Sequence, residues 1–228
     1  TELESMIAAS ERVEDYLLEE EEKKLENPVL LENVKGNITF DHVKFGYDQN
    51  KPIIKDFSAY VEKGKKIAIV GPTGSGKTTL VKLLMRFYDV NSGSILIDNI
   101  NIQDVDRNEL RKNIGMVLQD TWLYSDTIME NIRYGKLDAT DDEVIEASKE
   151  AQVHHFIQTL PNSYNMQINE ETSNISEGQK QLLTIARAIL RDPKVLILDE
   201  ATSSVDTRTE ELIQKAMDSL MKGRTSFI

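Results

Sequence analysis

The stretch of sequence that decides the fold is Gly71-Pro72-Thr73-Gly74-Ser75-Gly76-Lys77-Thr78, called the phosphate loop below. The apolar run from Ile67 to Val70 precedes it, and apolar residues at helical spacing follow it, as a phosphate-binding loop between a strand and a helix requires. The glycines let successive backbone N–H groups turn inward around phosphate oxygens, and the helix adds the positive end of its dipole. We expect Lys77 to bind the β- and γ-phosphates and the Thr78 hydroxyl to bind Mg²⁺.

A second cluster of candidate residues follows an apolar strand near the end of the chain. The run from Val195 to Leu198 is aliphatic throughout and delivers Asp199 and Glu200 to its carboxyl end. Open α/β sheets bind ligands at the carboxyl ends of their strands. We expect Asp199 to hold Mg²⁺, directly or through water, and Glu200 to orient and deprotonate an attacking water. The two motifs together predict nucleotide hydrolysis.

Short apolar runs alternate with helical periodicity from Lys65 onward, a pattern typical of buried parallel strands joined by crossover helices. The expected strands are 67–70, 114–118, 195–198 and 225–228. Residues 37–62 alternate in short apolar bursts around a turn-like segment, which indicates antiparallel strands. Residues 121–174 are mostly helical in pattern, with helices expected at 141–152 and 154–160. The sequence therefore predicts an α/β fold: a P-loop core with a mostly parallel sheet, an antiparallel β subdomain and a helical subdomain.

The charge of the chain disfavours nucleic acid as a partner. In its 228 residues, 39 Asp and Glu outnumber 27 Lys and Arg, for a net charge of −12, the wrong sign for binding a phosphate backbone. The absence of cysteine removes disulfides, zinc–thiolate sites and thiol nucleophiles. The longest unbroken apolar runs have four residues, against the ~20 needed to span a bilayer. We therefore expect no segment of this sequence to cross a membrane.

The start of the chain has the pattern of an amphipathic helix. Apolar residues at helical spacing, among them Ile7, Val13 and Leu17, predict a helix from residue 2 to about residue 22, ended by Asn27-Pro28. The first 26 residues also carry ten acidic and three basic side chains. Two interpretations stay open: a solvated connector that packs on a part absent from this sequence, or a specific acidic docking site.

Between the two motifs, the segment from Asn174 to Gln181 completes a pattern that resembles the nucleotide-binding domain of an ABC transporter of the exporter type. That family places an L-S-G-G-Q signature at the start of a helix, and Ile175-Ser176-Glu177-Gly178-Gln179, called the signature segment below, occupies that position. Ser176-x-x-Gln179 before an apolar helical run is also a capping-box pattern. Ser176 is therefore expected to begin a helix whose free N–H groups suit an anion.

The resemblance implies ligands for ATP and Mg²⁺. Tyr47 would stack on adenine, Gln119 would lie near Mg²⁺, and residues 203–206 would form the D-loop. The implied binding residues are Tyr47, Gly71, Thr73, Gly74, Ser75, Gly76, Lys77, Thr78, Thr79, Ser176, Gly178 and Gln179. Thr78, Gln119 and Asp199 would bind the metal, and Glu200, Gln119 and Lys77 would act in catalysis.

The resemblance also implies partners. Residues 1–27 would be a helical connector that follows a transmembrane domain of the same polypeptide. Residues 28–228 would be the nucleotide-binding domain, with a helical subdomain at about 121–175. Two such domains would sandwich ATP head to tail, with the signature of one at the γ-phosphate bound by the other. Their closure would power export from the cytoplasmic face of the membrane.

Two departures from the family pattern modify this expectation. Glu177 replaces a glycine of the signature and presents a negative charge to an incoming phosphate, which favours an unlike partner half with an intact signature. The family's switch histidine follows a strand like 225–228 and is absent from this sequence, so we expect little hydrolysis by this chain alone. Glu170 resembles the glutamate of the exporter X-loop, although Asn169 and Thr172 stand where glycines are usual.

Two other functions are compatible with a phosphate loop. A nucleotide-gated structural switch with little turnover is favoured by Glu177 and opposed by Glu200. A soluble ABC ATPase of DNA maintenance needs long heptad inserts before the signature, and this sequence has none. His154 and His155 are interpreted as packing and surface residues. Trp122 fits contact with a membrane domain and simple core packing equally.

Overall fold

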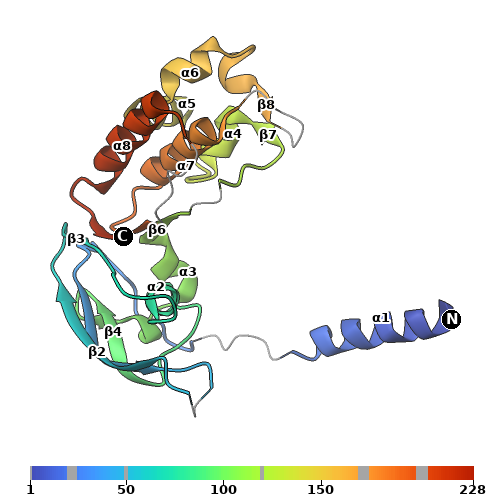
Figure 1. Ribbon diagram of the computed structural model, residues 1–228, viewed down its shortest axis with the longest axis vertical. Coiled ribbons are helices and arrows are strands. Elements are labelled where there is room, and N and C mark those ends of the chain that lie inside the picture. Colours follow the sequence, from blue (N-terminus) through green and yellow to red (C-terminus); the bar gives the residue numbers. More distant parts are fainter. Residues whose placement is uncertain (1, 20–24, 49–50, 119–120, 169–174, 199–204) are drawn as a thin grey trace.

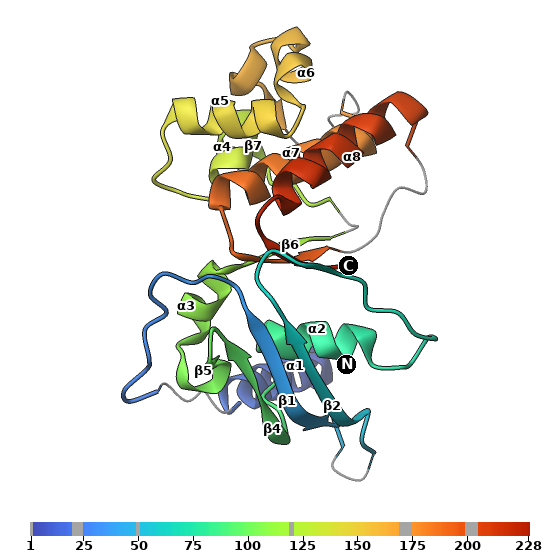
Figure 2. The same cartoon turned by 90° about the vertical axis from the view of Figure 1, so that its left-hand side faces the viewer.

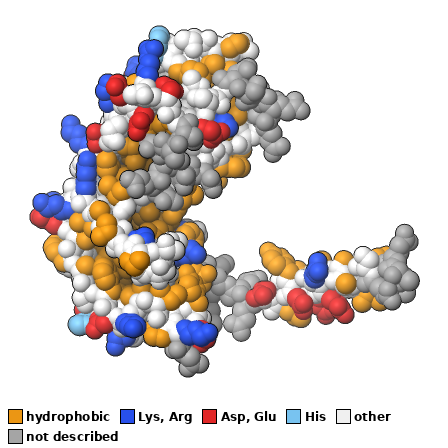
Figure 3. All heavy atoms as spheres, viewed as in Figure 1, with side chains coloured by type: hydrophobic (Ala, Val, Ile, Leu, Met, Phe, Trp, Pro, Cys, Tyr) orange, Lys and Arg blue, Asp and Glu red, His pale blue; other side chains and the backbone are white. Residues whose placement is uncertain are grey.

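The structure is a computed structural model of the whole chain. It describes residues 2–19, 25–48, 51–118, 121–168, 175–198 and 205–228. Two lobes lie on opposite sides of a small sheet, and the N-terminal helix extends away from both (Figure 1). The space-filling view is hollowed between the lobes, on the side from which this helix extends (Figure 3).

The central sheet is parallel and has the strand order β3-β10-β9-β6. Its strands are β3 (Lys66–Ile67), β10 (Thr225–Phe227), β9 (Val195–Leu198) and β6 (Ile114–Val117). Leu196 and Leu198 pack with the helical lobe, whereas Val195 and Ile197 pack with the opposite lobe. Because successive side chains of a strand point to opposite faces, one short apolar sheet joins both cores. The strands expected near residues 114, 195 and 225 are confirmed.

A helical lobe covers one face of this sheet (Figure 1). Its helices are α4 (Ile128–Arg133), α5 (Asp141–Glu150), α6 (His154–Thr159), α7 (Glu177–Arg191) and α8 (Thr207–Met221). A 3-10 turn, Ser163–Asn165, and a hairpin of β7 (Asp126–Thr127) and β8 (Gln167–Ile168) complete the lobe. The helices expected from residues 141 and 154 begin where the sequence predicts and end one or two residues earlier.

The other lobe is built on an antiparallel sheet of order β2-β1-β4-β5 (Figure 2). Its strands are β1 (Ile38–Phe45), β2 (Ile54–Val61), β4 (Ser92–Ile97) and β5 (Ile100–Asn101). The helix α2 (Lys77–Leu84) buries Leu80, Leu83 and Leu84 in the core that this sheet shares with β9 and β10. A 3-10 turn, Ile102–Asp104, and α3 (Arg107–Lys112) then lead into β6. The expected antiparallel strands are confirmed, and β4 and β5 are additions to them.

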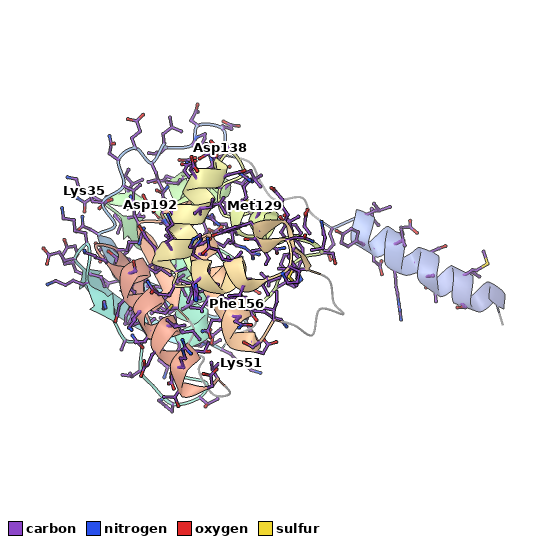
Figure 4. The ribbon with its side chains drawn as sticks, turned by 90° about the horizontal axis from the view of Figure 1, so that it is seen from above. Lys35, Lys51, Met129, Asp138, Phe156 and Asp192 are labelled. Atoms are coloured by element: carbon purple, nitrogen blue, oxygen red, sulfur yellow. The ribbon has the colours of Figure 1, made fainter. Side chains whose placement is uncertain are left out.

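The N-terminal helix is shorter than the sequence pattern predicts. It spans Glu2–Leu17 as α1, and no basic side chain lies in its last turn. The run Glu19 to Glu22 follows directly, and negative charge at a helix C-terminus opposes the helix dipole. Val13 is 59% and Leu17 is 75% exposed, and α1 lies outside the outline of both lobes when seen from above (Figure 4). Acidic side chains gather along one side of α1 (Figure 3).

The strand expected at residues 67–70 is also shorter than the sequence predicts. Only Lys66–Ile67 forms β3, and the last pairing joins the Ile69 N–H to the Ile228 carbonyl at 2.7 Å. Val70 is 87% exposed, so this aliphatic residue belongs to the approach to the phosphate loop rather than to the sheet.

Among the described residues, none of the helices is both long enough and apolar enough to cross a membrane.

Candidate nucleotide-binding site

The phosphate loop has a backbone that requires glycine at two positions. Gly74 has φ 82° and Gly76 has φ 93°, both in the left-handed region that favours glycine. Gly76 caps α2, and the Ser75 N–H donates to the Pro72 carbonyl at 3.1 Å, which closes a turn inside the loop. The loop therefore lies directly at the N-terminus of α2, where backbone N–H groups and the helix dipole favour an anion.

Lys77, the first residue of α2, reaches back across this loop. Its ammonium donates to the carbonyls of Gly71 at 2.5 Å and Pro72 at 3.1 Å. Thr78 is exposed, whereas Thr79 is 7% exposed and packs inward. The structure thus places the Lys77 ammonium and an exposed threonine at the loop, while Thr79 is buried.

The segment that contains Tyr47 is connected to the phosphate loop through the start of β2. A Cβ atom on Gly76 would lie 3.1 Å from the Ile53 side chain and 3.5 Å from that of Ile54. Ile54 pairs with Phe45 across the two strands, and Tyr47 follows Phe45 by two residues. Tyr47 is 52% exposed, which leaves aromatic surface for a ligand beside the phosphate loop.

The signature segment begins a helix in the way that the sequence predicts. The Ser176 N–H donates to Gln179 Oε1 at 2.9 Å, and the Gln179 N–H donates to Ser176 Oγ at 3.3 Å. This capping box starts α7, which confirms that part of the prediction. The Ser176 hydroxyl accepts one hydrogen bond there and can still donate its own proton.

Gly178 has a packing reason to be glycine. A Cβ atom at this position would lie 2.4 Å from Thr209 Cγ2 and 2.7 Å from Val205 Cγ1. The absence of a side chain therefore lets the first turn of α7 lie against α8. This requirement exists whether or not the segment meets a phosphate.

Glu177 is held on both sides. Its Oε1 lies 2.7 Å from the Lys180 ammonium, and its Oε2 accepts a hydrogen bond from the Thr121 hydroxyl at 3.1 Å. The hydrogen bond from Lys180 is the largest influence and lowers the pKa of Glu177 below its usual value; burial opposes this, and the hydrogen bond from Thr121 adds a smaller lowering. The carboxylate is therefore ionised at neutral pH and has a counter-charge beside it.

Several predicted site residues lie outside the described residues. They are Gln119, Asp199, Glu200, Ser203 and Ser204, together with Asn169, Glu170 and Thr172. Among the described residues, no group of three or more His, Cys, Asp or Glu could hold a metal. Hydroxyl, carboxylate and amide oxygens are the ligands that Mg²⁺ prefers, and the exposed Thr78 hydroxyl at the start of α2 fits that donor type.

Sequence reasoning missed a polar residue that connects parts of the helical lobe. Arg187 on α7 is mostly buried and donates to the carbonyls of Asn131 at 2.8 Å and Trp122 at 3.2 Å. Its guanidinium carbon also lies 5.4 Å from the centroid of the Tyr134 ring, within the range of a cation–π contact. Trp122 is 63% exposed, which excludes the core-packing interpretation. Arg187 interrupts the otherwise apolar run from Ile185 to Leu190, and that interruption was the available signal.

The two histidines take the roles expected of them. His154 Nδ1 lies 2.8 Å from the Tyr164 hydroxyl within the helical lobe, and His155 is exposed.

A glycine-rich loop between a strand of the parallel sheet and α2, with its lysine folded over it, defines a P-loop nucleotide-binding protein. The family model described as ABC transporter matches residues 54–203. The chain belongs to this ABC transporter family.

Relatives and a solved structure resemble the chain over nearly its whole length. It is 56% identical over 226 residues to the fatty acid ABC transporter ATP-binding/permease protein of Mycobacterium tuberculosis, covering 99% of this chain and 36% of that protein. It is 52% identical over 225 residues to the ABC transporter ATP-binding protein YfiC of Bacillus subtilis, covering 98% and 37%. A bacterial Atm1-family ABC exporter with ATP bound has a TM-score of 0.82 and 40% identity, with 98% of this chain and 39% of that chain covered. The chain thus spans little more than a third of these proteins.

Proposed function

We propose that this chain is the nucleotide-binding domain that binds and hydrolyses ATP to power a membrane exporter. ATP would bind between the phosphate loop and Tyr47. The observation that carries the proposal is the position of Lys77, whose ammonium lies over a loop built on two left-handed glycines. On nucleotide binding, the ammonium exchanges the carbonyls of Gly71 and Pro72 for β- and γ-phosphate oxygens. Tyr47 then stacks on adenine.

Hydrolysis is assigned to two residues of the phosphate loop, Lys77 and Thr78, and to three residues later in the chain. Thr78, Gln119 and Asp199 are the proposed Mg²⁺ ligands, and that ion neutralises phosphate charge when bound. Glu200 is the proposed general base that orients and deprotonates water. Gln119 and Lys77 are proposed to act in catalysis together with Glu200.

One proposed protein partner is another nucleotide-binding domain, docked head to tail. The N-terminus of α7, with the Ser176 hydroxyl and the free N–H groups of its first turn, is proposed to face the γ-phosphate bound by that domain. Glu177 stands where the family has glycine, and this favours an unlike half with an intact signature and a deviant residue at its own catalytic glutamate position. Glu177→Gly is expected to speed turnover at the weaker composite site only if that partner glutamate is also restored. Equal, full hydrolysis at both sites of the native complex would contradict an unlike pair.

The membrane-facing partner is proposed to be a transmembrane domain of the same polypeptide, connected through residues 1–27 at the cytoplasmic face of the membrane. A groove of about 260 Å³ lies beside the segment that follows Gln119, lined by Met116, Trp122, Tyr134, Arg187 and others. Its exposed aromatic side chains and its position on the helical lobe suit a docking segment from that domain.

The experiment that tests nucleotide binding compares two lysines of one helix. Lys77→Ala is expected to abolish ATP binding, because the phosphates lose the ammonium that meets them. Lys82→Ala, in the last turn of α2, removes the same charge from the opposite end and is expected to keep wild-type affinity. Calorimetric titration with ATP measures both variants. Unchanged ATP affinity in Lys77→Ala would refute the assignment of the site.

A further inference from the structure

We propose that Tyr88 and Asn91 are positioning residues for base recognition: they hold the ring of Tyr47 in place for the adenine. This inference rests on the proposed ATP site, and in particular on the stacking role of Tyr47. Both residues lie just after α2, in a segment that carries no recognised nucleotide motif.

The first observation is a closed group of three aromatic rings. The centroids of Tyr47 and Tyr88 are 5.0 Å apart at an interplanar angle of 81°. Phe45 meets Tyr47 at 5.1 Å and 84°, and it meets Tyr88 at 5.8 Å and 52°. Near-perpendicular contacts at these distances are the favourable edge-to-face geometry of aromatic pairs. Two rings therefore fix the orientation of Tyr47 while half of its surface stays exposed.

The second observation is a pair of hydrogen bonds beneath the same loop. The Gly46 N–H donates to Asn91 Oδ1 at 2.7 Å, and the Asn91 N–H donates to the Lys44 carbonyl at 3.0 Å. A Cβ atom on Gly46 would lie 2.6 Å from the Lys51 carbonyl, so the chain turns sharply at this glycine. Asn91 thus fixes the backbone on both sides of Phe45, immediately before Tyr47.

The third observation is that the supporting segment is itself anchored at the end of α2. Arg86 is 7% exposed, has φ 51°, and donates to the carbonyls of Ile102 at 2.9 Å and Val105 at 2.5 Å. Its Nε donates to Asp89 at 2.8 Å. The direction in which the chain leaves α2 is therefore set by a buried arginine, and Tyr88 is held where it meets Tyr47.

These contacts connect the two parts of the proposed nucleotide site. Lys77 begins α2 at the phosphates, and Tyr88 follows the end of the same helix at the base. An exposed tyrosine on an unsupported loop would lose rotamer freedom when a base stacks on it, and pre-ordering its ring removes that loss from the binding equilibrium. The Tyr88 ring therefore raises the affinity for ATP, which has a base, and leaves the affinity for polyphosphate without a base unchanged.

The experiment measures the affinity of the full chain for ATP and for tripolyphosphate, which shares the phosphates and lacks the base. Tyr88→Leu is expected to weaken ATP binding about 2- to 10-fold, the range that edge-to-face ring contacts correspond to, with tripolyphosphate unchanged. Tyr88→Phe keeps the ring and is expected to bind ATP like the wild type. Tyr60→Leu, which removes a 65%-exposed tyrosine from β2, is the matched control and is expected to change neither ligand.

A double-mutant cycle separates this inference from the proposed function. In a Tyr47→Leu background, Tyr88→Leu is expected to have no further effect on ATP. An equal loss for ATP and tripolyphosphate, or a full additional loss in the Tyr47→Leu background, would overturn the positioning role of Tyr88. Unchanged ATP affinity in Tyr47→Leu itself would overturn the stacking assignment on which the inference rests.

Asn91 gives an independent test of the same support. Asn91→Asp keeps an acceptor for the Gly46 N–H and is expected to preserve ATP affinity, whereas Asn91→Ala is expected to weaken ATP and spare tripolyphosphate. Thermal unfolding of each variant checks that the fold is intact. If Asn91→Ala bound ATP like the wild type in a folded chain, Asn91 would have no positioning role.

Discussion

The carboxylate of Glu177 accepts a hydrogen bond from the Thr121 hydroxyl at 3.1 Å, across 56 residues of sequence. Thr121 follows the predicted loop glutamine, Gln119, by two residues, and Glu177 begins the helix of the signature segment. The contact therefore connects the flank of this chain's own nucleotide site to the helix end that is proposed to face the partner's nucleotide. Lys180, at 2.7 Å from the other carboxylate oxygen, balances the charge.

This arrangement predicts that Lys180 protects the signature end of α7 from its own acidic residue. Lys180→Ala leaves the Glu177 carboxylate uncompensated near an incoming phosphate, and at ~6 Å with an effective dielectric of ~20 the unit repulsion is about 3 kcal/mol. Because the Glu177 side chain is 66% exposed, we expect screening to reduce this to about 1 kcal/mol. ATP-dependent dimerisation of the complete transporter should weaken about 5-fold, and Glu177→Gln should restore it.

Lys149→Ala is the matched control for this experiment. Lys149 pairs with Glu146 at 2.6 Å with the same three-residue spacing, on α5. Its removal should not affect dimerisation. If the two lysine variants behaved alike, or if Glu177→Gln failed to rescue Lys180→Ala, the charge-balance explanation would be wrong.

Glu200→Gln is expected to separate ATP binding from turnover. The substitution keeps a side chain of the same size and removes the group that deprotonates water. The ATP-bound state should persist, with hydrolysis reduced by about 100-fold or more, the scale of losing a general base. Single-turnover hydrolysis and retention of bound ATP measure the two effects. Wild-type hydrolysis by this variant in a complete transporter would remove Glu200 from the catalytic step.

The sequence predicted those parts of the fold that local patterns encode. Glycines at fixed spacing before a helix predicted the phosphate loop, and a run of four aliphatic residues predicted β9. The strand β4 (Ser92–Ile97) was missed because its Ser-Gly-Ser start has the composition of a turn. Its edges are decided by pairing with β1, which is distant in sequence.

The missed parts of the site depend on contacts between distant residues. No spacing rule relates Thr121 to Glu177, Gly178 to Thr209 or Tyr88 to Tyr47, because each pair meets only after the lobes have folded. Val70 shows the converse error. An apolar run predicted burial there, whereas the residue is 87% exposed where the chain leaves β3 for the glycine-rich loop.

Asp98 is expected to stabilise the fold in a pH-dependent manner. Its carboxylate accepts backbone N–H bonds from Lys35 at 2.6 Å, Gly36 at 3.0 Å and Asn37 at 2.9 Å, which tie the entry to β1 to the turn after β4. Burial opposes ionisation, but these hydrogen bonds outweigh it and lower the pKa of Asp98. Asp98→Asn should lower the free energy of unfolding by about 1–2 kcal/mol at pH 7, because hydrogen bonds to charged groups are strong and this site is partly exposed.

The sign of the pH effect follows from that lowered pKa. The ionised form is favoured in the folded state, so the stabilisation is complete above the unfolded-state pKa of about 3.9 and is lost as pH falls through the folded-state value. Urea unfolding of wild type and Asp98→Asn should therefore converge in strongly acid solution. Asp41→Asn, at an exposed position of β1, is the control and should show no such convergence. A difference between wild type and Asp98→Asn that stayed constant with pH would contradict the prediction.

Gly178→Ala is expected to destabilise the chain, against the intrinsic preference of helices. Alanine exceeds glycine in helix propensity by about 1 kcal/mol, so an open position would be stabilised by the change. At Gly178, however, the new methyl group would meet Thr209 Cγ2 at 2.4 Å and Val205 Cγ1 at 2.7 Å, and overpacking of this kind typically costs about 1–3 kcal/mol. We expect a net loss of about 1–2 kcal/mol in the free energy of unfolding, measured with urea. Thr209→Ser removes the nearer methyl group, keeps the backbone N–H that bonds Asp206, and should recover at least half of that loss. Because the clash lies between α7 and α8, ATP affinity of the phosphate loop on the same chain should stay unchanged. A stabilised Gly178→Ala variant, or an equal loss with and without Thr209→Ser, would show that this glycine is not kept for packing.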